Sequence, residues 1–171
     1  MLREVGARLE ADPRIEAAFI VGSMAEGKAD AYSDVDLVVA VGAGSLDAVF
    51  AERRRFLPRA PLCESVHEWG GGRKAYVLMP CFVIVELAFF APAIRFRMRG
   101  PYRLLFDRAG VVEQLPKGPR PTRRVIPTEA LAPDDVPFAL LAVLKTWARG
   151  DRRGARRLLR WIDGQPLTGR R

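Results

Sequence analysis

The sequence contains very little cysteine and histidine. Of its 171 residues, two are cysteines, Cys63 and Cys81, and one is a histidine, His67. The two cysteines lack the CxxC spacing of zinc sites, and a single histidine cannot complete a Cys/His cluster. The sequence therefore excludes this kind of zinc site, and we expect both cysteines to be buried, reduced thiols in a cytosolic protein.

A continuous hydrophobic run of membrane-spanning length is also missing. The apolar stretch at residues 76–93 is interrupted by Pro80 and Glu86, whereas a membrane-spanning helix needs about 20 consecutive apolar residues. Acidic residues likewise interrupt the apolar positions of residues 1–19, so this segment lacks the apolar centre of a signal peptide. We therefore expect a soluble, cytoplasmic protein without a membrane contact.

Negative charge is scarce at one end of the chain. The net charge is +8, and residues 149–171 hold eight arginines against two aspartates. Most of the excess positive charge therefore belongs to this C-terminal segment. An arginine-rich helix face is usually solvated surface, and RNA binding is the alternative that such a segment leaves open.

Hydrophobic residues are abundant, at 49% of the chain beside 28% charged residues. This composition is typical of a globular chain, and the length suits one domain with a core, or a domain with a small helical appendage. Helical and strand patterns alternate early in the sequence, which favours an α/β (α+β) sheet. The predicted elements are helices over residues 2–11 and 45–57 and strands over 17–21, 36–41, 63–69, 74–79 and 81–90.

Prolines break the sequence repeatedly between residues 95 and 128, which predicts an irregular connector. After it, the apolar pattern predicts two helices, over residues 138–149 and 152–162. We therefore expect a core domain over residues 1–115, a proline-rich connector over 116–132 and a short helical segment over 133–171.

Two carboxylates open the predicted strand at residues 36–41. Asp34 and Asp36 stand two positions apart, so on a strand their side chains point to the same face, about 7 Å apart along the backbone. Like charges this close repel each other, and a divalent cation between them removes the repulsion. Carboxylate oxygens suit Mg²⁺, which usually takes one or two of them and completes its shell with water and substrate phosphates.

Gly22 and Ser23 directly follow the predicted strand at residues 17–21. Glycine permits a sharp turn and a close backbone approach, and the amides of such a turn, with the Ser23 hydroxyl, can donate hydrogen bonds to phosphate oxygens. A turn that binds phosphates and a carboxylate pair that binds the metal together predict a nucleoside triphosphate as the ligand.

A third carboxylate, Glu86, interrupts the apolar strand at residues 81–90, where an uncompensated acid would be costly. Its strand parity would set it beside Asp34 and Asp36 if the two strands are neighbours. Three carboxylates would allow a two-metal site, in which one ion activates an acceptor hydroxyl and the other neutralises the departing pyrophosphate.

These residues together resemble the nucleotidyltransferase superfamily related to DNA polymerase beta, and especially its small antibiotic and minimal nucleotidyltransferases. The residues that carry the resemblance are Gly22 and Ser23, a spacer of ten residues, Asp34 and Asp36 within SDVDLVV, and Glu86. The stretch LLFDRAGVV at residues 104–112 is similar to a segment of those bacterial proteins. The helices after Pro133 are similar to the start of their C-terminal helical domain.

The resemblance implies a nucleotidyltransferase fold, which is a small mixed β-sheet with helices packed on it, here followed by a short C-terminal helical segment. It implies an enzyme that transfers a nucleoside monophosphate from ATP or another nucleoside triphosphate to a hydroxyl, and that releases pyrophosphate. The acceptor would be a small molecule such as an aminoglycoside-like antibiotic. Asp34 and Asp36 would be catalytic ligands of Mg²⁺, and Glu86 would be a third ligand or the general base.

The expected nucleotide-binding residues are Gly22, Ser23, Ser33 and Lys145. Two interpretations of Lys145 stay open: it could reach triphosphate oxygens from its helix, or lie at the helix edge with its charge in solvent.

The resemblance leaves several partners and functions open. The acceptor could be a protein instead of a small molecule, and a homodimer could complete the acceptor pocket. Some minimal relatives act as antitoxins that modify or mask a partner protein, so an antitoxin or a catalytically degenerate binding module is the alternative to an enzyme. The arginine-rich C-terminus adds the modification of RNA ends as a further alternative.

Overall fold

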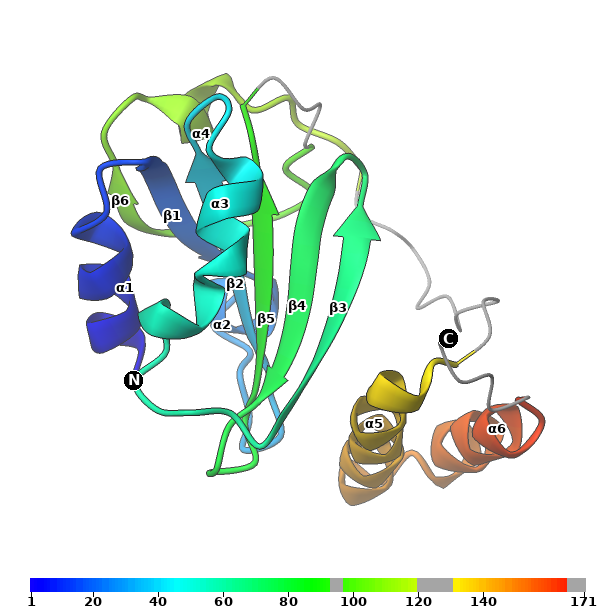
Figure 1. Cartoon of the computed structure of the whole chain (residues 1–171). Helices are drawn as coiled ribbons and strands as arrows, with labels where there is room; N and C mark the ends of the chain where they lie inside the picture. The colour runs from blue at the N-terminus through cyan, green and yellow to red at the C-terminus, as the bar shows by residue number, and fades with distance from the viewer. Residues whose placement is uncertain (93–96, 120–130, 166–171) are drawn as a thin grey trace. The chain divides into compact units, whose positions relative to one another are not determined.

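The structure, a computed structural model, describes residues 1–92, 97–119 and 131–165 (Figure 1). The chain divides into two compact units, Met1–Pro121 and Thr122–Arg171. Residues 120–130 of the expected connector and residues 166–171 of the expected helical segment lie outside the described residues.

The first unit is built on a six-stranded sheet with the strand order β3-β4-β5-β2-β1-β6. Strands β2 and β5 pair in parallel, and the other neighbouring strands pair antiparallel. A small mixed sheet with helices packed on it was predicted, and the structure confirms it. The elements of this unit are α1 (Leu2–Glu10), β1 (Ile15–Val21), α2 (Gly22–Ala25), β2 (Val35–Val41), α3 (Leu46–Ala51), η1 (Arg53–Phe56), β3 (Cys63–Trp69), β4 (Gly72–Leu78), β5 (Ile84–Phe90), β6 (Arg103–Asp107) and α4 (Val111–Gln114).

Helices α1 and α3 and the short helix η1 cover one face of the sheet (Figure 1). Successive strand residues point to opposite faces, so every second residue of a strand belongs to this side. Leu37 and Val39 of β2 and Leu87 and Phe89 of β5 all lie here, fully or almost fully buried. These apolar positions make the larger core of the unit.

The opposite face of the sheet has a smaller core. Ala17, Phe19, Val38 and Phe90 lie on it, packed with residues from the chain between 98 and 115. The residues that this segment contributes are Met98, Val111, Val112 and Leu115. By the same alternation, Asp36 and Glu86 point to this second face, together with Lys74 and Tyr76 of β4.

Strand β6 and helix α4 lie in a region that the sequence predicted to be an irregular connector, so that prediction was wrong for residues 103–114. Strand β6 pairs with β1 at the edge of the sheet. Pro101 and Pro116 stand outside the two elements rather than within them. The prolines therefore bound these elements and leave the backbone N–H groups of β6 free to enter the ladder.

Two predicted elements have different limits in the structure. Strand β5 begins at Ile84 instead of residue 81, because Phe82 has a left-handed backbone with φ 58° and its N–H donates to the carbonyl of Met79. The helix predicted over 45–57 is broken at Glu52 into α3 and η1.

The expectation that both cysteines are buried was also wrong. Both are free thiols, but Cys81 is exposed and Cys63 is half-buried. Cys81 belongs to the turn before β5, and Cys63 is the first residue of β3, the edge strand of the sheet. Neither position is enclosed on all sides.

The second unit contains η2 (Pro133–Asp135), α5 (Val136–Ala148) and α6 (Arg152–Asp163). Gly150 joins the two long helices with a left-handed φ of 85°, and Asp151 caps α6 by accepting a hydrogen bond from the N–H of Gly154 at 2.8 Å. Helices α5 and α6 pack against each other. Among the residues that the structure describes, no helix is long and apolar enough to cross a membrane.

Candidate active site

The turn at Gly22 lies directly against Asp36. Strand β1 ends at Val21, which is opposite Asp36 in the antiparallel ladder with β2. Gly22 follows with φ 69°, and a β-carbon added there would lie 2.0 Å from Oδ2 of Asp36. Only glycine combines this backbone with this contact. The fold therefore joins Gly22 to the second aspartate, although 13 residues lie between them in the sequence.

The loop between these two positions is held by its own hydrogen bonds. The Ser33 hydroxyl donates to Oδ1 of Asp30 at 2.8 Å and accepts from the N–H of Asp30 at 2.9 Å. At the other end of the loop, the N–H of Lys28 donates to the carbonyl of Ser23 at 2.9 Å. Ser33 thus orders the chain immediately before Asp34, while its predicted contact with the nucleotide stays a prediction.

Glu86 lies next to Asp36 across the parallel ladder. The two residues are Cα partners in the register of β2 and β5, and adjacent strands are about 4.8 Å apart. Strands β2 and β5 are therefore neighbours, which is the condition for Glu86 to lie beside the aspartate pair. Asp34 immediately precedes β2, and all three carboxylate residues are half-buried.

The ion pair between Glu86 and a lysine was not predicted from the sequence. Nζ of Lys74 is 2.6 Å from Oε1 of Glu86, and the two side chains are 15% and 23% exposed. The same ammonium lies 4.9 Å from the ring centroid of Trp69 and 5.6 Å from that of Tyr76. The alternation of strand residues could have suggested this pair. Lys74 and Tyr76 are two residues apart on β4 and so point to the same face, and Tyr76 is the register partner of Glu86.

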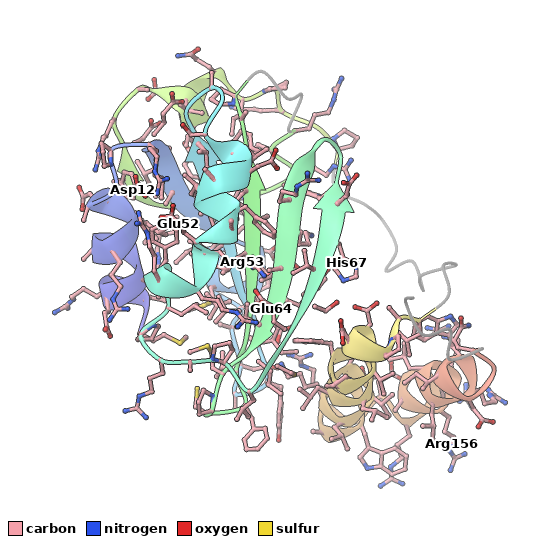
Figure 2. All side chains as sticks on the ribbon, in the orientation of Figure 1. Asp12, Glu52, Arg53, Glu64, His67 and Arg156 are labelled. Carbon is pink, nitrogen blue, oxygen red and sulfur yellow. The ribbon has the colours of Figure 1, made fainter. Side chains whose placement is uncertain are left out.

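A short polar row continues along this part of the sheet on β3, where Figure 2 labels His67. Nε2 of His67 is 2.9 Å from the hydroxyl of buried Ser65. The His67 ring meets that of Tyr76 edge-on, with 5.5 Å between centroids. His67 therefore packs against Tyr76, which lies beside the Lys74–Glu86 pair.

The side chains of Asp34 and Asp36 fit a hard divalent cation, since both supply carboxylate oxygens at the start of strand β2. Glu86 differs, because its carboxylate is already bound by an ammonium. Across residues 1–92, 97–119 and 131–165, no group of three or more His, Cys, Asp or Glu side chains is arranged to hold a metal ion. The assignment of Glu86 as a metal ligand therefore stays a prediction.

Lys145 belongs to the second unit, in the last turn of α5. Its role as a nucleotide ligand also stays a prediction. The same unit carries four arginines of α6 that line a surface hollow with Asp151 and Gly154. These arginines are Arg153, Arg156, Arg157 and Arg160.

Comparison with protein families supports the resemblance. The family model described as "Nucleotidyltransferase domain" matches residues 2–59, which begin in α1 and end after η1. The match includes the Gly22 turn, the Asp34–Asp36 pair and the loop between them. No curated protein matches the chain.

Residues 2–59 thus match a nucleotidyltransferase domain, which is consistent with the DNA polymerase beta type and with the mixed α+β sheet. Glu86 and Lys74 lie beyond the matched residues. Their relation to the site therefore rests on the sheet register and on the contacts in the structure alone.

Proposed function

We propose that the chain transfers a nucleoside monophosphate from a nucleoside triphosphate, with ATP as the first candidate, to a hydroxyl group of a small molecule. The observation that carries this proposal is the meeting of three features within one sheet. The Gly22 turn packs on Asp36, Asp36 is the register partner of Glu86, and Gly22 and Asp36 lie within the matched residues 2–59.

The reaction proposed is an in-line displacement at the α-phosphorus. The acceptor hydroxyl oxygen forms a bond to phosphorus, and the bond from phosphorus to the oxygen that bridges the α- and β-phosphates breaks. Pyrophosphate leaves with that bonding pair, and the hydroxyl proton passes to a base. Glu86 is the candidate base, with a role as metal ligand as the alternative.

Asp34 and Asp36 would hold magnesium, which neutralises charge on the triphosphate when bound. The turn at Gly22 and Ser23 would receive phosphate oxygens through its amides and the Ser23 hydroxyl. The bonds between Ser33 and Asp30 would keep the approach to Asp34 in one conformation.

The test is an incubation of the chain with Mg²⁺ and nucleoside triphosphates labelled at the α-phosphate, together with panels of aminoglycosides, lincosamides, RNA and protein. We expect label on a hydroxyl-bearing small molecule and loss of that transfer in Asp36→Asn. The matched control is Asp47→Asn, since Asp47 is an exposed aspartate of α3 that pairs with Arg73. Transfer that survives Asp36→Asn would contradict the assignment of the metal site.

RNA is a second candidate acceptor, favoured by the arginines of α6. Within the described residues, none of the four that line the hollow has an ion-pair partner, whereas Arg14, Arg53 and Arg73 of the first unit each pair with an acid. Several guanidinium groups gathered along one helix suit a phosphate backbone.

The salt dependence of RNA binding tests this second candidate. If α6 contacts phosphates, Arg156→Gln with Arg157→Gln should weaken binding of a single-stranded RNA and lower the slope of log K against log salt by about 1.4 for two contacts. Arg3→Gln with Arg59→Gln removes the same charge from exposed sites of the first unit. Equal effects of the two double variants would reject α6 as the RNA contact.

A binding module, including an antitoxin that acts on a partner protein, is the alternative to an enzyme. It requires nucleotide binding or partner binding without turnover. Co-purification or genomic pairing with a small helical protein would favour it, and label found on that protein would instead make the partner the acceptor.

A further inference from the structure

Lys74 is fixed at the candidate active site by contacts from three strands. It lies on β4, binds Glu86 of β5 at 2.6 Å and has its ammonium 4.9 Å from the ring centroid of Trp69 at the end of β3. Tyr76, two residues along β4, adds a second ring at 5.6 Å. Cation–π contacts to two rings and an ion pair with a carboxylate hold this ammonium in one place.

The position of Lys74 differs from that of a surface lysine. Its side chain is 15% exposed, whereas the side chain of Lys28, which also pairs with a glutamate, is 74% exposed. Burial of an ammonium is costly unless it is paired, and Glu86 supplies the pairing charge. The Lys74–Glu86 ion pair is therefore a fixed, half-buried feature of the sheet face that carries Asp36.

The ammonium competes with any metal ion for Glu86. Magnesium binds a carboxylate oxygen at about 2.0–2.1 Å, and Oε1 of Glu86 already has a cation 2.6 Å away. Two positive charges at one oxygen would repel strongly in a half-buried site. A divalent ion bound through the other oxygen, Oε2, would still lie close to the ammonium, so Lys74 lowers the affinity of Glu86 for such an ion.

We propose that the ammonium of Lys74 takes the place of a second divalent cation at Glu86, so that the nucleotide-loaded chain binds one metal ion, at Asp34 and Asp36. This inference rests on the proposed function, since it assumes the metal at the aspartate pair. Lys74 is a positioning residue here: it holds Glu86 and supplies a fixed positive charge on the face where the triphosphate would lie.

The test counts bound Mn²⁺ on the whole chain saturated with a non-hydrolysable ATP analogue, using the EPR signal of the free ion. We expect one ion per chain for the unaltered sequence. Lys74→Met removes the charge and frees Glu86, so the count should rise to two. Lys74→Arg keeps a cation and should keep the count at one, and Lys28→Met is the control that removes an exposed lysine charge.

The outcomes separate the inference from the proposed function. Two ions on the unaltered chain, or one ion on Lys74→Met, would overturn the role of Lys74 and leave nucleotidyl transfer standing. No bound ion at all would overturn the proposed function and the inference with it. If Lys74→Met does not fold, the count on the unaltered chain still decides between one ion and two.

Discussion

Asp12, just after α1, is the most deeply buried carboxylate of an ion cluster that ties the first helix to η1. Its side chain is 2% exposed and accepts hydrogen bonds from Nη2 of Arg14 at 2.7 Å and from Nε of Arg14 at 3.0 Å. Arg55 also pairs with Asp12, and Glu52 pairs with Arg14 at 2.8 Å and with Arg55 at 2.7 Å. Figure 2 labels Asp12 and Glu52.

These contacts make the stability of the protein depend on pH in acid. The side-chain hydrogen bond from Arg14 lowers the pKa of Asp12 from its ordinary value of 3.8 to about 2. A lowered folded-state pKa stabilises the fold above the unfolded pKa, here by about 2 kcal/mol, and this contribution is lost as the pH falls from about 4 through about 2. Unfolding by urea across this range should show the loss, and Asp12→Asn should remove this part of the acid dependence. An unchanged acid profile in Asp12→Asn would contradict the assignment.

Gly22 can be tested against a second glycine that has nearly the same backbone. Gly22 and Gly27 have φ 69° and 68°, but an added β-carbon meets Asp36 at Gly22 and nothing within 4 Å at Gly27. Both alanine variants should lose about 1–2 kcal/mol of stability from the left-handed backbone. Only Gly22→Ala should also displace the Asp36 carboxylate and reduce nucleotidyl transfer, by about 100-fold. Equal transfer by the two variants would separate Gly22 from the site.

At the scale of elements, β5 links the two sides of the first unit. Phe89 points to the larger core, where its ring centroid lies 5.6 Å from that of Phe50 on α3 and 6.5 Å from that of Phe56 on η1. Glu86 points to the opposite face beside Asp36. The strand that carries the third carboxylate is therefore also the strand that anchors α3 and η1.

Removal of the Phe89 ring should consequently destabilise the unit strongly. Phe89 is fully buried, and Phe89→Ala should lower the free energy of unfolding by about 3–5 kcal/mol through lost burial and a cavity. Phe82→Ala is the matched control, because Phe82 is 66% exposed in the turn before the same strand. Chemical denaturation measures both, and a cost at Phe82 as large as that at Phe89 would contradict this account of the core.

At the scale of the whole molecule, both apolar cores belong to the first unit. Every residue of the two clusters lies between residues 2 and 115. We expect a chain truncated after residue 119 to unfold in one cooperative thermal transition, with a midpoint within about 4 °C of the full chain, which corresponds to roughly 1 kcal/mol or less. Circular dichroism would follow the transition. Absence of a cooperative transition in the truncated chain would show that the second unit is needed for the fold.

Much of the fold could be predicted because local patterns are strong at particular places. The alternation from Cys63 to Trp69 predicted β3 with its observed limits, and the apolar run after Asp36 predicted β2 to within one residue. Strand β6 was missed because its apolar run, residues 104–106, is only three residues long and lies in a segment where prolines favour irregular structure. Its pairing with β1 is a long-range contact, which periodicity does not report.

The sequence by itself determined the Gly22-Ser23 pair, the Asp34–Asp36 pair and the similarity of residues 2–59 to a nucleotidyltransferase domain, because the family match needs only a contiguous stretch of residues. Only the tertiary structure decided which charged side chains lie next to Glu86. A parallel pairing with β2 sets Glu86 beside Asp36, and an antiparallel pairing with β4 brings Lys74 to the same carboxylate. Register between strands far apart in the chain creates both contacts, so no local pattern could contain them.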